Sequence, residues 1–269
     1  MFRKLLYCIK ILISIILHYL YQPSTTPKLH IPEPVQTTTQ LPTYLAQMGK
    51  GLTSIPKGAP SVRSVNYGYN NIFNLSANIF SYNGFAVLDR IQLSHNQITI
   101  IHQRAFRHLN YLKVVDLSGN NLTILDVNTF KTNVNLEKLD LTTNKIRFRN
   151  RPFLKSASLT TLILSDNRIE QIFELNFTKL PKLRNLVLNS NVMFVIADHS
   201  FQPLTNLVYL SLANSGVYRL SEEMFKNGSY PKIIDVTDTP LASKFNPPLR
   251  KVKNEGVVSL INIDKYSYF

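Results

Sequence analysis

The chain has 269 residues, of which 44% are hydrophobic and 17% are charged, and it carries a formal net charge of +14 at pH 7. This composition supports a buried core and excludes both a fibre and a globally disordered chain. With nine glycines and no G-x-x-x-x-G-K-[ST] segment, the sequence offers no loop that would cradle a nucleotide phosphate. Beyond Cys8 there is no cysteine, so the rest of the chain can form no disulfide, zinc thiolate site or cysteine nucleophile.

Residues 1–21 have the order of a membrane-targeting segment. Arg3 and Lys4 precede a run that is almost wholly apolar up to Leu20, which is typical of a secretory signal. A buried core helix fits less well, because the segment is terminal and a polar stretch follows it. Lys10 interrupts the run and no small-x-small cleavage site follows, so a cleaved signal and an uncleaved anchor both stay open. An anchor of this kind would be short against the roughly 20 residues that a bilayer requires. We expect a secreted or surface-anchored protein that contacts a membrane only through this segment, if it is retained.

Residues 22–47 contain five prolines among many serines and threonines. Proline removes backbone donors, and a stretch without apolar periodicity cannot bury enough surface to offset chain entropy. The sequence therefore predicts an extended Pro/Thr-rich linker over this range.

Residues 48–241 repeat one unit at intervals of 23 to 26 residues. One ladder consists of asparagines, continued by Ser215 and Thr239: Asn70, Asn96, Asn120, Asn144, Asn167 and Asn191. A second ladder with the same period consists of phenylalanines: Phe80, Phe106, Phe130, Phe153, Phe177, Phe201 and Phe225. An x-L-x-L alternation before each asparagine predicts a short strand with inward leucines, which only stacking on a neighbouring unit can bury. The asparagine amide can bond backbone groups of the adjoining coil, whereas serine and threonine offer only a hydroxyl, so we expect looser packing toward the C-terminal end.

The consensus of these units is L-x-x-L-x-L-x-x-N-x-L, followed by an apolar residue and F-x-x-L. It resembles the leucine-rich-repeat family, specifically the typical 24-residue class common in extracellular receptors and matrix proteins. The resemblance implies an α/β solenoid of about eight repeats, curved, with a parallel sheet on the concave face and coil and short helical turns on the convex side. Residues 51–58 are similar to the end of that family's N-terminal cap, but the cysteine-rich caps are lacking. We expect residues 242–269 to form a cysteine-free C-terminal cap or tail, with residues 257–263 as an added edge strand.

Strand residues between inward leucines should point to solvent on the concave face. Thirteen of them are candidate protein-binding residues: Tyr69, Asp89, Arg90, Gln92, His95, Asp116, Glu137, Asp140, Thr143, Asp166, Asn189, Tyr209 and Asp235. On the whole face seven acids (Asp89, Asp116, Glu137, Asp140, Asp166, Asp235, Asp238) stand against six bases (Arg63, Arg90, Lys113, Lys138, Arg184, Lys232), a net charge of −1. A groove for nucleic acid would need an excess of cations, so we expect a protein ligand and no nucleic acid. A solvated strand face without a partner is the alternative.

One stretch concentrates positive charge, and we call it the basic segment: Lys145, Arg147, Arg149, Arg151 and Lys155. It coincides with the shortened repeat and contains Pro152. A solvated convex loop is the simpler interpretation. The alternative is a patch for sulfated glycan or an anionic membrane surface, because like charges held together repel unless a polyanion meets them. The second functional hypothesis is therefore a matrix or adhesion protein held by sulfated glycans.

Four N-x-[ST] sequons are expected on the coil or convex side, where glycans would not block stacking: Asn74, Asn121, Asn176 and Asn227. The six histidines are scattered and no serine lies in a G-x-S-x-G elbow, so the sequence shows no catalytic or metal constellation. We expect a non-enzymatic protein-binding module with no cofactor.

Overall fold

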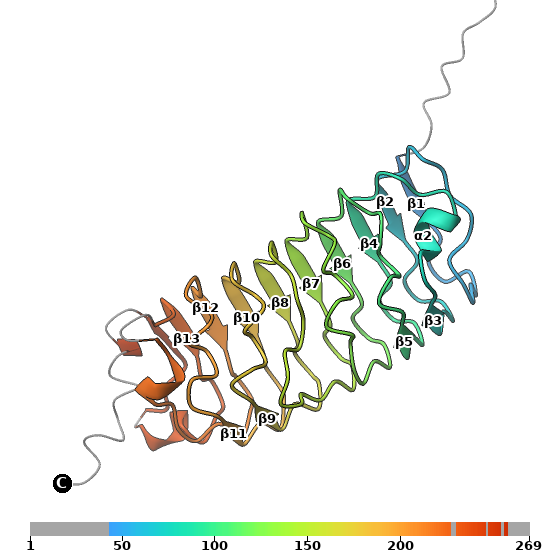
Figure 1. The fold of residues 1–269 in the computed structure, drawn as a ribbon. Helices are drawn as coiled ribbons and strands as arrows, with labels where there is room; N and C mark the ends of the chain where they lie inside the picture. Colours follow the sequence, from blue (N-terminus) through green and yellow to red (C-terminus); the bar gives the residue numbers. More distant parts are fainter. Residues whose placement is uncertain (1–42, 227–229, 246, 254–255, 258–269) are drawn as a thin grey trace, which may run out of the picture. The chain divides into compact units, whose positions relative to one another are not determined.

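A computed structural model describes residues 43–226, 230–245, 247–253 and 256–257, and these form a solenoid of about eight stacked coils (Figure 1). The expectations for residues 1–21, for most of the linker and for Asn227 lie outside the described residues. In the described part, no helix has the length and apolar character needed to cross a membrane.

One ten-stranded sheet runs the length of the solenoid, with one strand from each of the eight coils and one further strand at either end. Its middle residues, such as Ile91, Val115 and Leu139, are fully buried, and their neighbours on either side point away from the core. All neighbouring strands pair in parallel except the last two, which are antiparallel. In spatial order the strands are β1 (Tyr44–Ala46), β2 (Ser64–Asn66), β4 (Arg90–Gln92), β6 (Val114–Asp116), β7 (Lys138–Asp140), β8 (Thr161–Ile163), β10 (Asn185–Val187), β12 (Tyr209–Ser211), β13 (Ile233–Asp235) and β14 (Lys251–Lys253). This is the leucine-rich-repeat solenoid that the sequence predicts.

The other sides of the coils contain little regular structure. Two short parallel pairs, β3 (Asn74–Leu75) with β5 (Ile100–Ile101) and β9 (Gln171–Ile172) with β11 (Val195–Ile196), lie on one flank. The helical elements in the described residues are short: α2 (Ile79–Tyr82), η1 (Glu222–Met224) and η2 (Ala242–Lys244). The convex side is otherwise built of turns and bends.

Buried asparagines join each coil to the one before it. The Asn144 side-chain oxygen accepts from the backbone N–H of Leu122 at 3.0 Å, and its amide nitrogen donates to the carbonyls of Leu117 and Leu141, both at 3.0 Å. Asn120 repeats this pattern one coil earlier, and Asn96, Asn167 and Asn191 repeat it elsewhere. At the ladder's end, the Ser215 hydroxyl donates only within its own coil, to the carbonyl of Leu212.

The residue before each ladder position has a left-handed backbone, with φ between 49° and 63° in all eight coils. These residues are Tyr69, His95, Gly119, Thr143, Asp166, Ser190, Asn214 and Asp238. Left-handed geometry is unfavourable for residues with a Cβ atom, and the side-chain hydrogen bonds of the following asparagine, serine or threonine hold the turn in place. Residue type gives little sign of this geometry, since only one of the eight is glycine.

The shortened repeat keeps its core through a shift of one residue. Two residues separate Leu122 from buried Leu125, whereas one residue separates Ile146 from buried Phe148. The Phe148 ring packs on Phe153 with centroids 5.0 Å apart, and on the ring of the next coil. The phenylalanine ladder is therefore continued here by an additional ring.

Both ends of the solenoid differ from expectation. β1 lies inside the range 22–47 predicted as linker, but it pairs with β2, and the Asn70 amide donates to the carbonyl of Gln47 at 2.8 Å. Residues 44–46 therefore belong to the sheet, because the backbone groups of β2 need a partner. At the other end β14 is the antiparallel edge strand, and most of the range 257–263 that was expected to form one lies outside the described residues. Val257 is buried and, like Gly256, has helical backbone geometry.

Candidate concave binding face

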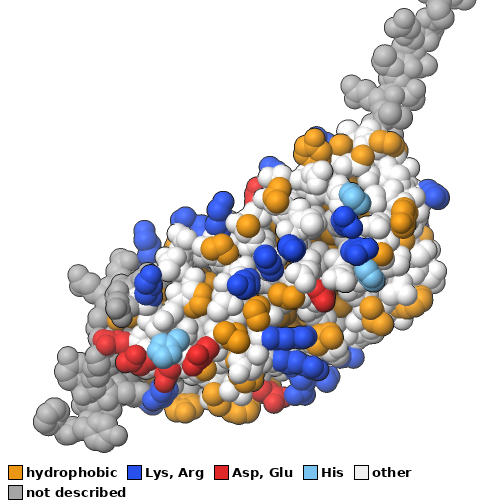
Figure 2. Space-filling model, in the orientation of Figure 1, with side chains coloured by type: hydrophobic (Ala, Val, Ile, Leu, Met, Phe, Trp, Pro, Cys, Tyr) orange, Lys and Arg blue, Asp and Glu red, His pale blue; other side chains and the backbone are white. Residues whose placement is uncertain are grey.

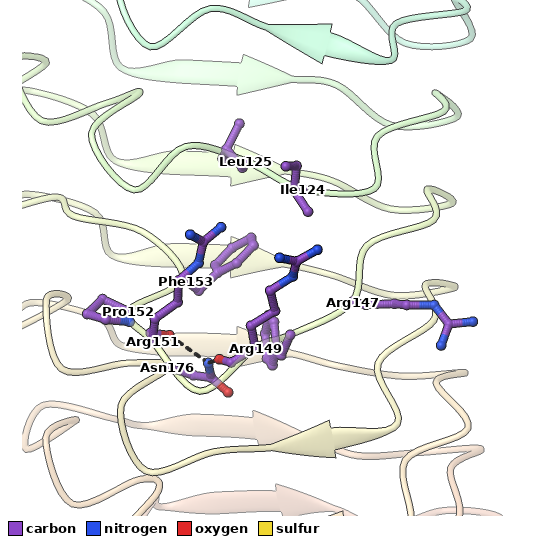
Figure 3. Close-up of a pocket in the computed structure, with 9 residues that line it drawn as sticks. Ile124, Leu125, Arg147, Arg149, Arg151, Pro152, Phe153 and Asn176 are labelled. Carbon is purple, nitrogen blue, oxygen red and sulfur yellow. Dashed lines mark hydrogen bonds between the residues drawn. The ribbon is translucent and has the colours of Figure 1, made fainter.

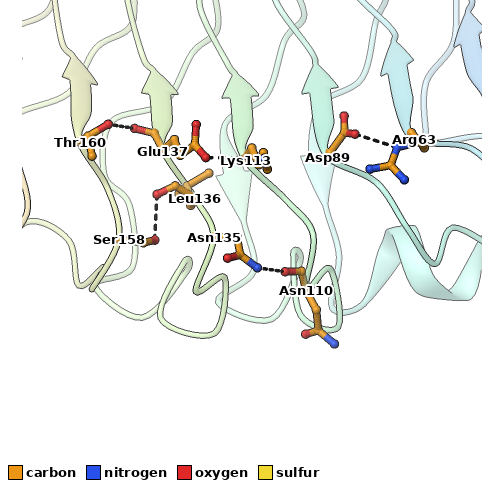
Figure 4. Close-up of polar contacts among 9 residues, drawn as sticks. All are labelled: Arg63, Asp89, Asn110, Lys113, Asn135, Leu136, Glu137, Ser158 and Thr160. Atoms are coloured by element: carbon orange, nitrogen blue, oxygen red, sulfur yellow. Dashed lines mark hydrogen bonds and ion pairs between the residues drawn. The ribbon is translucent and has the colours of Figure 1, made fainter.

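Opposite charges alternate where the strands begin. Arg63 Nε lies 3.0 Å from Asp89 Oδ2, and Lys113 Nζ lies 3.8 Å from Glu137 Oε1 (Figure 4). The Thr160 hydroxyl donates to the carbonyl of Glu137 at 3.0 Å on the next coil. Exposed pairs of this kind contribute little to stability, so their main effect is to fix the charge pattern of the face.

Two carboxylates lie side by side at the middle of the sheet. Asp116 on β6 and Asp140 on β7 are register partners, and neighbouring strands are about 4.8 Å apart. Asp116 Oδ1 accepts from the backbone N–H of Ser118 at 2.9 Å and from its hydroxyl at 2.6 Å. Thr142 holds Asp140 in the same way, at 3.0 and 2.6 Å. In the described part of the chain neither carboxylate has an ion pair. The two charges are rigidly held and mutually repulsive, so a cation placed between them would be stabilised.

A third acid of the same column is covered. Asp235 on β13 is 6% exposed. Its Oδ2 lies 3.6 Å from Lys251 Nζ of β14 and accepts a long hydrogen bond of 3.4 Å from the Tyr209 hydroxyl. Thr237 holds its Oδ1 as Thr142 holds that of Asp140. The expectation that Asp235 offers a contact to a partner is therefore wrong, because the antiparallel edge strand neutralises it.

An aromatic pair borders the N-terminal half of the face. The Tyr69 ring and the His95 imidazole stack with centroids 4.4 Å apart and an interplanar angle of 16°. The imidazole continues over Gly119 of the next coil, where an added Cβ would lie 2.7 Å from His95 Nδ1. Glycine here has φ +63° and leaves room for the ring. The stack is a flat, exposed platform.

The other expected residues follow the strand geometry. Arg90 and Gln92 are the outward residues of β4, while Thr143 and Asp166 occupy exposed left-handed corners. Asn189 is half-buried, and its Oδ1 atom is buried without a hydrogen-bond partner among the described residues. Sequence alternation thus identifies the face, but the structure separates its exposed residues from its covered ones.

The cations of the basic segment differ in direction and in pairing. The Arg147 guanidinium is paired with Glu170 of the next coil, and it points away from Arg149 and Arg151 (Figure 3). The backbone carbonyls of Arg149 and Arg151 accept from the buried side-chain amide of Asn176, at 2.7 and 2.9 Å. The side chains of Arg147, Arg149 and Arg151 nevertheless line one small pocket, so a polyanion site over residues 145–155 stays a prediction.

The sequons differ in exposure. Asn74 is exposed and Asn121 is half-buried, but Asn176 is fully buried. Asn176 Oδ1 also accepts from the backbone N–H of Phe173 at 2.8 Å. Both the oxygen and the nitrogen of its side-chain amide are therefore hydrogen-bonded within the fold. The expectation that Asn176 lies where a glycan fits is wrong.

Among the described residues, no group of three or more His, Cys, Asp or Glu side chains is arranged to hold a metal ion. The acids of the concave face come from several coils and lie at the starts of strands, at their ends or at the left-handed corners that follow them. The concave face is therefore suited to contacts with the surface of another molecule.

Stacked coils, an asparagine ladder and one extended parallel sheet define a repeat protein of the leucine-rich type. A sequence profile described as "Leucine rich repeat" matches residues 60–122, 86–146 and 157–229, more than half of the chain. The chain belongs to the leucine-rich-repeat family. No curated protein matches this sequence.

Many solved structures share the fold, and two of them serve as examples. One is the Drosophila Toll–Spatzle complex, at TM-score 0.55 and 23% identity, over 65% of this chain and 24% of that chain. The other is the octameric complex of Latrophilin 3, Unc5D and the leucine-rich repeats of FLRT2, at TM-score 0.56 and 20% identity, over 71% of this chain and 67% of that chain. This chain therefore spans about a quarter of the first. Both likenesses concern the fold.

Proposed function

We propose that this chain is a non-enzymatic module, exported or surface-anchored, that binds a protein partner on its concave face. The observation that carries the proposal is the rigid, uncompensated carboxylate pair of Asp116 and Asp140 at the centre of an extended sheet. Side chains fixed before binding lose little entropy when a partner docks, and a fixed pattern of charges selects the partner.

The surroundings of the pair support a protein rather than a small molecule. Ion pairs and exposed polar residues flank it, and the Tyr69–His95 stack lies on the two coils that precede Asp116. Aromatic anchors beside charged groups are typical of protein interfaces. The complexes named for the two structural neighbours, Toll with Spatzle and FLRT2 with Unc5D and Latrophilin 3, are consistent with this use of the fold. Residues 1–21, as a signal or anchor, support export.

The test begins with capture of a partner from extracellular or cell-surface protein by the full chain. Its affinity is then compared for Asp116→Asn/Asp140→Asn and for a matched control, Asp126→Asn/Asp198→Asn, which removes two exposed acids outside the sheet. Asparagine keeps the oxygen that accepts from Ser118 and Thr142, so the fold should be unchanged. We expect at least tenfold weaker binding for the first variant and unchanged binding for the control. Equal affinity of the two variants would refute the assignment to the concave face.

A further inference from the structure

A cleft on the convex side is lined by polar and basic residues of two successive coils. The β4 coil contributes Gln103, Arg104 and Arg107, and the β6 coil contributes Asn128, Lys131 and Thr132. We call these six residues the convex basic cleft. No acid lines it. Lys131 lies 27 residues after Arg104 in the sequence, so only stacking of the coils brings it close to Arg104 and Arg107.

The cations of the cleft have no counter-charge in the described part of the chain. Arg104, Arg107 and Lys131 are exposed, and none of them forms an ion pair there, in contrast to Arg63 and Arg147. Like charges held around one hollow repel each other, and an anion placed between them relieves that repulsion.

Part of the basic segment continues the cleft. Arg104, Asn128 and Arg151 each stand two residues before a ladder phenylalanine, in three successive coils. The backbone N–H of Lys155 donates to the carbonyl of Val127 at 2.8 Å, which places Lys155 next to Asn128. With Lys131 on the middle coil, cations are thus present on three successive coils.

The nearest acid in the sequence is Asp126, whose carboxylate accepts from the backbone N–H of Asn128 at 2.8 Å. One carboxylate does not balance the charges of Arg104, Arg107 and Lys131, so the convex basic cleft keeps a net positive charge. Figure 2 shows Lys and Arg side chains gathered over the middle of the solenoid, whereas the largest group of Asp and Glu lies near its C-terminal end.

We propose that the convex basic cleft binds a linear sulfated polysaccharide that runs along the solenoid across these three coils. Guanidinium groups match the geometry of oxyanions such as sulfate. Gln103, Asn128 and Thr132 supply neutral donors and acceptors suited to sugar hydroxyls. Aromatic platforms, on which nucleic-acid bases stack, are absent from the six lining residues. The site is independent of the concave face, so the two proposals can fail separately.

Heparin is the probe, used with the full chain on an immobilised column and, as a defined dodecasaccharide, in equilibrium binding at several NaCl concentrations. The variant is Arg104→Gln/Arg107→Gln/Lys131→Gln. The matched control is Lys57→Gln/Lys182→Gln/Lys226→Gln, which removes three exposed charges elsewhere. Single Arg107→Gln serves as a milder variant. All these side chains are exposed, and thermal melts confirm that each variant folds.

We expect the cleft variant to elute at lower NaCl and to bind at least tenfold more weakly at physiological salt. Each lost contact should also flatten the slope of log K against log[NaCl] by about 0.7 to 0.9, as counterion release predicts. The control should stay within about twofold of the parent chain. Equal loss in the two triple variants would overturn the site. Equally tight binding of desulfated heparin, of duplex DNA or of anionic vesicles, lost with the same variant, would overturn the assignment to sulfated polysaccharide.

Discussion

Replacing Asn144 with alanine tests how the coils are held together. Its side chain accepts from the Leu122 N–H and donates to three carbonyls, two of which belong to Leu117 and Leu141. Those two carbonyls also accept from Asn120 and Asn167, so they keep a partner after the substitution. The Leu122 N–H loses the side-chain acceptor that it has in the native fold.

The expected cost follows from these contacts. A buried donor left without a partner costs about 1–3 kcal/mol, and the loss of shared hydrogen bonds adds to it, so Asn144→Ala should lower the free energy of unfolding by about 2–4 kcal/mol. Ser215→Ala removes one bond, to Leu212 within its own coil, and should cost about 0.5–1.5 kcal/mol. Asn144→Asp keeps the acceptor but directs a buried charge at the carbonyls of Leu117 and Leu141, so it should be at least as damaging as alanine.

Urea unfolding followed by far-ultraviolet circular dichroism measures these differences. Repeat arrays can unfold in steps, so hydrogen exchange at the Leu122 amide provides a local readout of the same bond. Stability of Asn144→Ala within about 0.5 kcal/mol of Ser215→Ala, or an Asn144→Asp variant more stable than Asn144→Ala, would refute the ladder as the link between coils.

Three further predictions concern single residues. Gly216→Ala should destabilise by about 1–3 kcal/mol, because the new Cβ would lie 2.6 Å from the Met193 carbonyl oxygen, and a shift in thermal midpoint measures it. Burial raises the pKa of Tyr67 to about 12 from 10, so the free energy of unfolding should fall as pH rises from 10 to 12. Tyr67→Phe should remove this part of the alkaline loss, as measured by denaturation midpoints at each pH. At pH 7 the same variant should be neutral or stabilising, since the hydroxyl lacks a hydrogen-bond partner among the described residues. In protein secreted by a eukaryotic host, peptide mapping should find glycan at exposed Asn74 and none at buried Asn176.

Much of the fold follows from periodicity. Leucines at fixed spacing can be buried only if every unit places them on the same side, and Asn96, Asn120 and Asn144 recur because each serves the same backbone groups. Repetition also identifies the column that contains Asp116 and Asp140, since strand alternation assigns them to the outward face. The repeat pattern in the sequence predicts the tertiary structure correctly wherever a coil packs only against coils with the same pattern.

The sequence by itself determined the stack, its ladders and the direction of the strand residues. The tertiary structure alone decided which polar groups are used up within the fold. Asp235 is neutralised by an edge strand that returns from the C-terminal side, and Asn176 is buried by a loop of the preceding coil. Arg104 and Lys131 line the same cleft, whereas the Arg147 guanidinium pairs with Glu170 of the next coil and points away from Arg149 and Arg151. The physical reason is that burial and charge pairing depend on what lies against a residue from the next coil, and the position of a residue within its own repeat does not contain that information.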